Sequence, residues 1–140
     1  MGSIDQGASV ALSADGNTAI VGGGSWWNLH IGATGAAWVF TRNSGVWTQQ
    51  GSKLVGSGAV GNANQGESVA LSADGNTAVV GGPKDNSDAG AAWVFARNSG
   101  VWTQHAKLVG NGAVGEDSQG AVALSAKKAK GRRINFKHTA

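Results

Sequence analysis

The chain contains two nearly identical copies of a unit of about 55 residues. Residues 7–23 (GASVALSADGNTAIVGG) return at 66–82, residues 35–49 (GAAWVFTRNSGVWTQ) return at 90–104, and residues 53–61 (KLVGSGAVG) return at 107–115. A third copy opens at 119–126 with QGAVALSA. A period of this length is typical of repeat architectures, in which each unit is one supersecondary motif that buries its apolar faces against its neighbours. The repeat therefore constrains the fold more than any single motif does.

The two copies differ mainly in one segment. The offset between them is 59 residues at the first block, 55 at the second and 54 at the third. Copy one carries a four-residue insertion, because GSWWNLHIGAT at 24–34 stands where copy two has PKDNSDA at 83–89. We divide the chain into a first repeat at 1–62, a second repeat at 63–117, the start of a third at 118–126, and a basic tail of different origin at 127–140.

Each unit contains four short segments of strand-forming residues. In copy one these segments are 9–13, 18–21, 36–41 and 46–50, which are rich in Val, Ala, Thr and Trp. Asp15-Gly16 and Asn43-Ser44-Gly45 separate them, and glycine accepts the positive φ that tight hairpin turns need. The pattern predicts an all-β fold of β-propeller-type blades, each of four antiparallel strands, with about two and a half blades per chain.

Two and a half blades leave apolar faces uncovered. A single sheet of this kind cannot bury its own faces, and propellers close with typically 4–8 blades. We therefore expect self-association to complete a ring, and three chains would supply roughly seven blades. The alternative, that the sequence is a fragment of a longer propeller, stays open.

Several elements recur in a fixed order in copy two. Gln65-Gly66 precedes Ser68-Val69-Ala70, Gly81-Gly82-Pro83 follows, and Gly90–Phe95 reads GAAWVF. This order resembles the FG-GAP repeat, which is known from integrin α-chain propellers and from many bacterial surface proteins. The resemblance covers residues 7–126. It implies a non-catalytic module for adhesion or recognition, cell-surface or secreted, with a protein or glycan ligand.

The sequence departs from the family at its calcium loop, which is a spaced run of Asp and Asn residues. Here Asp15 and Asp74 are the single carboxylates of the two equivalent segments, SADGNT at 13–18 and at 72–77. Calcium takes six or more oxygen ligands, so one carboxylate predicts a hairpin turn and no metal site. We expect no cofactor.

Candidate ligand-binding residues lie in the segment that differs between the copies. Trp26, Trp27 and His30 belong to the insertion of copy one, and adjacent tryptophans could form a stacking platform for a sugar, which would make the protein a lectin-like oligomer. One of them could equally fill the ring interior or a subunit contact. Asp85 and Asp88 belong to the oxygen-rich segment of copy two, which could face a ligand or form a plain polar turn.

Aromatic residues that recur at the repeat spacing are expected to pack between blades. They are Trp38, Phe40 and Trp47 in copy one and Trp93, Phe95 and Trp102 in copy two. The three histidines are scattered, and no Ser-His-acid order appears, so the sequence does not predict an enzyme.

Charge is divided unevenly along the chain. Six of the 11 basic residues lie in 127–140, and the other five stand against 8 acidic residues, which gives 1–126 a net charge of −3. The tail could bind nucleic acid through phosphate contacts, but charge runs of this kind are commonly disordered, so we expect no nucleic-acid partner. No segment approaches the ~20 apolar residues of a membrane span.

Overall fold

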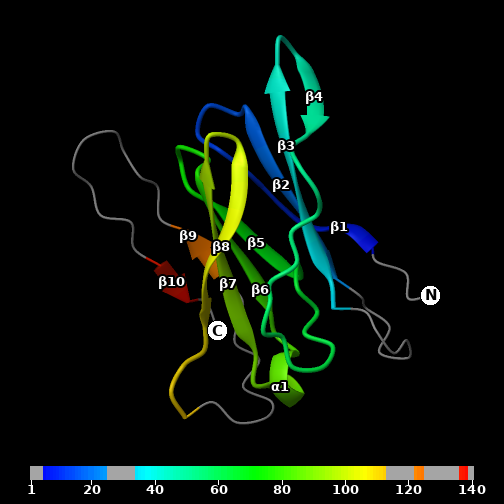
Figure 1. Ribbon diagram of the computed structural model, residues 1–140, viewed down its shortest axis with the longest axis vertical. Helices are drawn as coiled ribbons and strands as arrows, with labels where there is room; N and C mark the ends of the chain where they lie inside the picture. Colours follow the sequence, from blue (N-terminus) through cyan, green and yellow to red (C-terminus); the bar gives the residue numbers. More distant parts are fainter. Residues whose placement is uncertain (1–4, 25–33, 113–121, 125–135, 139–140) are drawn as a thin grey trace.

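A computed structural model describes residues 5–24, 34–112, 122–124 and 136–138 (Figure 1). Ten strands account for nearly all of its regular structure. They are β1 (Asp5–Leu12), β2 (Thr18–Gly24), β3 (Ala36–Asn43), β4 (Val46–Gln49), β5 (Ser68–Leu71), β6 (Thr77–Gly82), β7 (Ala91–Asn98), β8 (Val101–Leu108), β9 (Val122–Leu124) and β10 (Phe136–His138). The short element α1 (Asp85–Asp88) lies between β6 and β7.

The strands pair with their neighbours in sequence order. Strands β1 to β4 form one four-stranded antiparallel sheet, here called blade one, and β5 to β8 form a second, blade two. Strands β9 and β10 form a two-stranded antiparallel pair. The predicted all-β fold of four-stranded blades is confirmed. No helix in the described part of the chain has the length and apolar character to cross a membrane.

Each blade has two faces of different character, because side chains alternate along a strand and directly paired residues share a face. One face, here called the head face, contains two rows of paired residues that run across the first three strands. In blade two the rows are Val69, Val80 and Trp93, and Leu71, Ala78 and Phe95. The opposite tail face carries smaller side chains, which are Ala70, Val79, Ala92 and Val94 in blade two.

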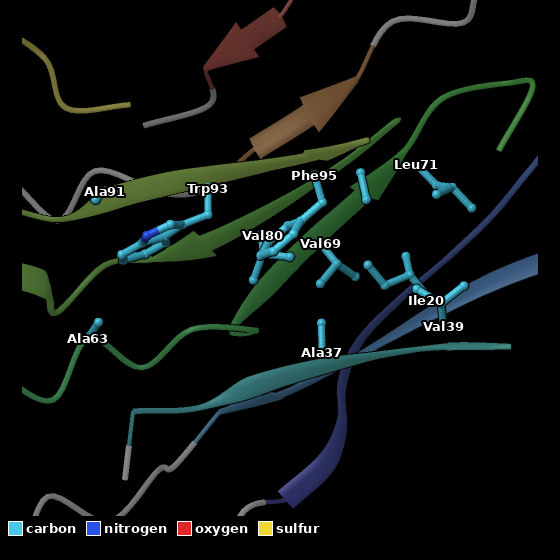
Figure 2. Packing of buried hydrophobic residues seen from close by; sticks show 11 residues of the cluster. Ile20, Ala37, Val39, Ala63, Val69, Leu71, Val80, Ala91, Trp93 and Phe95 are labelled. Carbon is cyan, nitrogen blue, oxygen red and sulfur yellow. The ribbon is translucent and has the colours of Figure 1, made fainter. Parts of the chain in front are cut away.

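The main core lies between the two blades. The head face of blade two packs against Ile20, Ala37 and Val39 on the tail face of blade one, as Figure 2 shows. Each of these three side chains is almost completely buried. Large aromatic side chains on one sheet thus meet small aliphatic ones on the next, which is how facing layers interdigitate without voids.

The pair β9–β10 continues the stack on the other side of blade two. Strand β9 lies against β5 and β6, and Figure 1 shows the three sheets in the order blade one, blade two, β9–β10. A second buried cluster of Val79, Ala92 and Val94 forms on this tail face. Successive sheets are therefore stacked head to tail.

Glycine allows the closest approach of backbone between the blades. Gly66 has φ of +92°, and a Cβ there would collide with the carbonyl oxygen of Ala36 in blade one. At Gly56, in the connection between the blades, a Cβ would collide with the indole ring of Trp93. Both close approaches are possible because glycine has no Cβ, and Gly66 in addition needs the freedom of glycine to adopt a positive φ.

Element α1 is a turn and not a regular helix, which agrees with the absence of a helical period in this segment of the sequence. Asn86 (φ 50°, ψ 60°) and Ser87 (φ 55°, ψ 51°) have left-handed dihedral angles, and Asp88 has φ of 70°. The element is thus a left-handed turn, and Asn and Asp tolerate this region better than other non-glycine residues. The polar turn formers of this segment explain the conformation.

Candidate interaction surfaces

Arg97 is the centre of the polar contact between the blades. Its guanidinium carbon lies 5.2 Å from the ring centre of Trp102, and its Nε donates to Asn76 Oδ1 at 3.0 Å within blade two. Its terminal nitrogens cross to blade one, where they donate to Thr18 Oγ1 at 3.2 Å and to Gln50 Oε1 at 3.1 Å. Burial lowers the pKa of Arg97 from its ordinary value, although nearby carboxylates oppose this effect. One arginine therefore joins both blades.

Gln50 is an interface residue that sequence reasoning missed. Its Oε1 also accepts a hydrogen bond from Trp102 Nε1 at 2.9 Å. Blade one has three residues between Gln49 and Lys53, whereas blade two has two in the equivalent place. The extra residue ends β4 at Gln49, and the chain rejoins the sheet only at the bridge between Leu54 and Ala37. The available signal was the change of repeat offset from 55 to 54.

A hollow of about 330 Å³ opens beside Gln50. It lies between the segment that follows β4 in blade one and the β7–β8 turn of blade two. Its lining residues are Gln50, Gly51, Ser52, Lys53, Leu54, Gly100, Val101 and Trp102. The irregular path of the chain after β4 thus creates a depression at the outer edge of the contact between the blades.

Gln65, which directly precedes Gly66 at the start of the second repeat, is completely buried. Its side chain accepts from the backbone N–H of Gly56 at 2.6 Å and donates to the carbonyl of Gly56 at 3.0 Å. Its backbone N–H donates to Thr34 at 2.7 Å. Gln65 therefore closes the connection between the blades on itself and fastens it to the segment that leads into β3 of blade one. Within the described ranges, every buried side-chain nitrogen and oxygen has a hydrogen-bond partner.

The head face of blade one is open, although it has the same residues as the covered head face of blade two. Val10 is 68% exposed where its counterpart Val69 is 9% exposed. Leu12 is 61% exposed where Leu71 is 8% exposed. Val10 pairs with Val21, in the same register that Val69 has in blade two. The difference in exposure comes from position in the stack and not from the residues.

The recurring aromatic residues are in different environments in the two blades. Trp93 and Phe95 lie in the core between the blades, and Trp102 packs partly buried against it. Trp38 and Phe40 are half-buried on the open head face of blade one. The sixth aromatic residue, Trp47, is 42% exposed.

Arg42 in blade one repeats the local contacts of Arg97. Its Nε donates to Asn17 Oδ1 at 3.2 Å, and its guanidinium carbon lies 5.3 Å from the ring centre of Trp47. Among the described residues, no hydroxyl or amide oxygen takes the places that Thr18 and Gln50 hold at Arg97. The open face therefore has both the apolar rows and the arginine of an interface between blades.

Asp85 and Asp88 have separate environments. Asp85 is 1% exposed, accepts a hydrogen bond from the backbone N–H of Val60 at 2.7 Å, and forms an ion pair with Lys107 Nζ at 2.8 Å. Asp88 is exposed on the turn. Lys107 also donates to the carbonyl of Gly58 at 2.7 Å. The buried carboxylate thus fixes the turn to the sheet and to the connection between the blades.

The other candidate residues are not in the described part of the structure. Trp26, Trp27 and His30 lie outside it, as does most of the basic tail, of which only 136–138 is described, as β10. Among the described residues, no group of three or more His, Cys, Asp or Glu side chains could hold a metal ion.

The two SADGNT segments form hairpin turns that their own side chains close. Asp15 Oδ1 accepts from Ser13 Oγ at 2.7 Å and from the backbone N–H of Asn17 at 2.9 Å, and Asp74 makes the same contacts in blade two at 2.7 and 3.0 Å. These bonds favour the ionised carboxylate, with Ser13 as the largest cause, and lower the pKa of Asp15 below its ordinary value. The carboxylate of Asp15 therefore stabilises the hairpin turn in which it lies.

We expect Asp15→Asn to flatten the acid dependence of stability. A folded-state pKa below the unfolded value means that the ionised group stabilises the fold above its ordinary pKa, and that this contribution is lost as the pH falls through the folded pKa. Urea unfolding between about pH 5 and pH 2 should show a shallower decline for the variant than for wild type. Ser13→Ala, which removes the main cause, should shift the profile in the same direction. Parallel profiles for all three proteins would contradict this account.

The stacked four-stranded sheets define a β-propeller-type repeat protein. Residues 47–95 match the family model of the FG-GAP repeat. The match begins in β4 of blade one and ends in β7 of blade two, so it spans the junction described above. Residues 47–95 are therefore similar to the FG-GAP repeat, a type that is generally non-enzymatic and typical of extracellular or surface proteins. No curated protein matches the chain.

Proposed function

We propose that the protein is a non-catalytic β-propeller-type module for adhesion or recognition, secreted or on the cell surface, which assembles by blade stacking and meets a protein or glycan through the loop between the second and third strands of each blade. The main observation behind the proposal is that the two repeats differ mostly in this loop. The sheets have nearly the same sequence, whereas this loop is GSWWNLHIGAT in one copy and PKDNSDA in the other. Binding residues are commonly carried by loops on a rigid scaffold.

The loop of blade two supports this role because hydrogen bonds hold it in a fixed conformation. Buried Asp85 anchors it, and the backbone N–H of Asn86 donates to the carbonyl of Val60 at 2.9 Å. Asn86, Ser87 and Asp88 are exposed and have left-handed φ angles. Left-handed conformation costs roughly 1–2 kcal/mol per non-glycine residue, and such strain gathers at functional positions. A fixed polar turn presents its groups with little loss of entropy on binding.

A loop exchange tests the proposal. Residues 24–34 are replaced by the PKDNSDA segment of copy two, and both proteins are applied to an array of glycans and an array of extracellular-matrix proteins. We expect wild type to bind a defined subset of probes and the exchange to weaken that binding by at least about tenfold. The far-ultraviolet circular dichroism and the melting temperature of the exchange variant are compared with those of wild type, which shows whether the variant is folded.

The array also separates a glycan partner from a protein partner. The double variant Trp26→Ala/Trp27→Ala removes the two aromatic rings and leaves the rest of the loop, so a lectin-like activity predicts loss of the glycan signals alone. Binding that is equal in wild type and exchange variant, or no binding to either array, would overturn the proposed role of the loops.

A further inference from the structure

The hollow beside Gln50 lies at a place where the two repeats differ in length. Residues 50–52 (QGS) stand in blade one where blade two has only 105–106 (HA). The extra residue carries the chain out of the sheet after β4, and a space of about 330 Å³ opens between this segment and the β7–β8 turn. Sites for small molecules measure roughly 300–1,000 Å³. The hollow therefore has the size of a site for a small ligand.

The side-chain amide of Gln50 is held in one orientation and keeps its donors unused. Its Oε1 accepts from Arg97 at 3.1 Å and from Trp102 Nε1 at 2.9 Å, which occupies both lone pairs of the oxygen. Within the described ranges Nε2 donates to no other residue, and no buried side-chain nitrogen lacks a partner, so Nε2 is open to solvent. Nε2 lies 3.5 Å from the position that a Cβ of Gly100 would take, and Gly100 also lines the hollow. The contact between the blades thus places two N–H donors at the hollow.

The charge around the hollow is positive. Of the described residues that line it, Lys53 alone is charged, and its exposed ammonium forms no ion pair in this part of the chain. A second cation, Arg97, lies directly behind Gln50. The carboxylates of Asp15 and Asp74 act on Arg97, but neither lines the hollow. A group that carries negative charge on oxygen therefore complements the lining.

The rest of the lining includes an aromatic ring and two aliphatic side chains. Trp102 is half-buried, and the Arg97 guanidinium carbon lies 5.2 Å from its ring centre. Leu54 is half-buried beside it, and Val101 is exposed. An indole next to hydrogen-bond donors suits a ligand that has both an apolar face and polar groups at its rim, as a sugar ring has.

We propose that the hollow binds an acidic sugar of the uronic acid type, with its carboxylate at Lys53 and the amide of Gln50 and its ring against Trp102. The described lining residues all come from the two blades and the segment between them, so no further sheet is needed to form the site. The hollow is separate from the loop between the second and third strands of each blade. It would be a second binding site on the same module.

Titration with D-glucuronate tests the site. In the ¹⁵N-labelled chain, the side-chain amide of Gln50 and the indole N–H of Trp102 should shift with a dissociation constant of about 1 mM, which is reasonable for a ligand of this size. Methyl glucoside lacks the carboxylate and acetate lacks the ring, so both should bind at least about tenfold more weakly. Equal binding of either compound, or no shift at about ten times the expected dissociation constant, would overturn the proposal.

Gln50→Glu separates ligand binding from the contact between the blades. The variant keeps oxygen acceptors for Arg97 and Trp102, but it replaces the N–H donors with a negative charge. We expect glucuronate binding to weaken at least about tenfold while the melting temperature stays at or above that of wild type. Lys53→Gln should weaken binding by a similar factor, and Lys53→Arg, which keeps the charge, should preserve most of it.

Unchanged binding in Gln50→Glu or in Lys53→Gln would show that glucuronate binds elsewhere, and the proposal would be wrong. If Gln50→Glu does not fold, the pair of Lys53 variants still decides, because Lys53 is exposed. The loop exchange at 24–34 changes none of the described lining residues. Failure of the array experiment and failure of this titration are therefore distinguishable.

Discussion

Trp93→Ala is expected to lower the free energy of unfolding by about 3–5 kcal/mol, the range for removing a large aromatic side chain from a core. Trp93 is completely buried between the blades, and its Nε1 donates to the carbonyl oxygen of Ser57 at 2.9 Å. Lys107 Nζ lies 5.4 Å from the ring centre. The substitution therefore opens a cavity, removes the shorter of the two hydrogen bonds to the Ser57 carbonyl oxygen and removes a cation–π contact. Urea unfolding followed by far-ultraviolet circular dichroism measures the loss.

The repeat offers a matched control at Trp38. It has the equivalent position in blade one, with the same neighbours along the strand, but it is only half-buried on the open head face. Trp38→Ala should cost about 1 kcal/mol in dilute solution, where docking of a second chain does not bury the ring. Equal losses for the two substitutions would show that the contact between the blades does not determine the stability. Trp93→Phe keeps most of the volume and gives a measurable protein if Trp93→Ala does not fold.

Asp85→Asn is expected to cost about 2–3 kcal/mol. Removing one charge of a buried ion pair typically costs 3–5 kcal/mol, because the partner is left buried and uncompensated. Asp85 is buried, but the side chain of Lys107 is 22% exposed, so water offsets part of the loss. The amide still accepts the hydrogen bond from Val60, which leaves the lost charge as the main change. The same urea unfolding experiment measures this effect.

Asp88→Asn is the control, because it makes the same chemical change three residues away at an exposed position. It should alter stability by less than about 0.5 kcal/mol. A double-mutant cycle with Lys107→Gln should give a coupling energy of about 1–3 kcal/mol between Asp85 and Lys107. A coupling near zero, or equal effects at the two aspartates, would show that the ion pair does not anchor the loop.

The fold could be predicted from the sequence to the level of single strands. The Asp-Gly and Asn-Ser-Gly turns separate segments of β-branched and aromatic residues, so the antiparallel order of each sheet follows from local chemistry. The period of about 55 residues shows that the sheet is repeated. The candidate site could be predicted only in part, because the side chains that join the blades meet across long sequence separations. Arg97 and Thr18 are 79 residues apart, and Gln50 and Trp102 are 52 apart.

The sequence by itself determined the repeat, the strands, the turns and the alternation of large and small side chains on the two faces of each sheet. These features depend on contacts within one unit, and both copies have them. The tertiary structure alone decided which copy buries its head face. Val10 and Val69, or Trp38 and Trp93, are the same residues in the same local context, yet the first of each pair is uncovered and the second is in the core. The physical reason is that burial depends on the neighbouring sheet, which stands on one side of blade two and is absent from the equivalent side of blade one in the described residues.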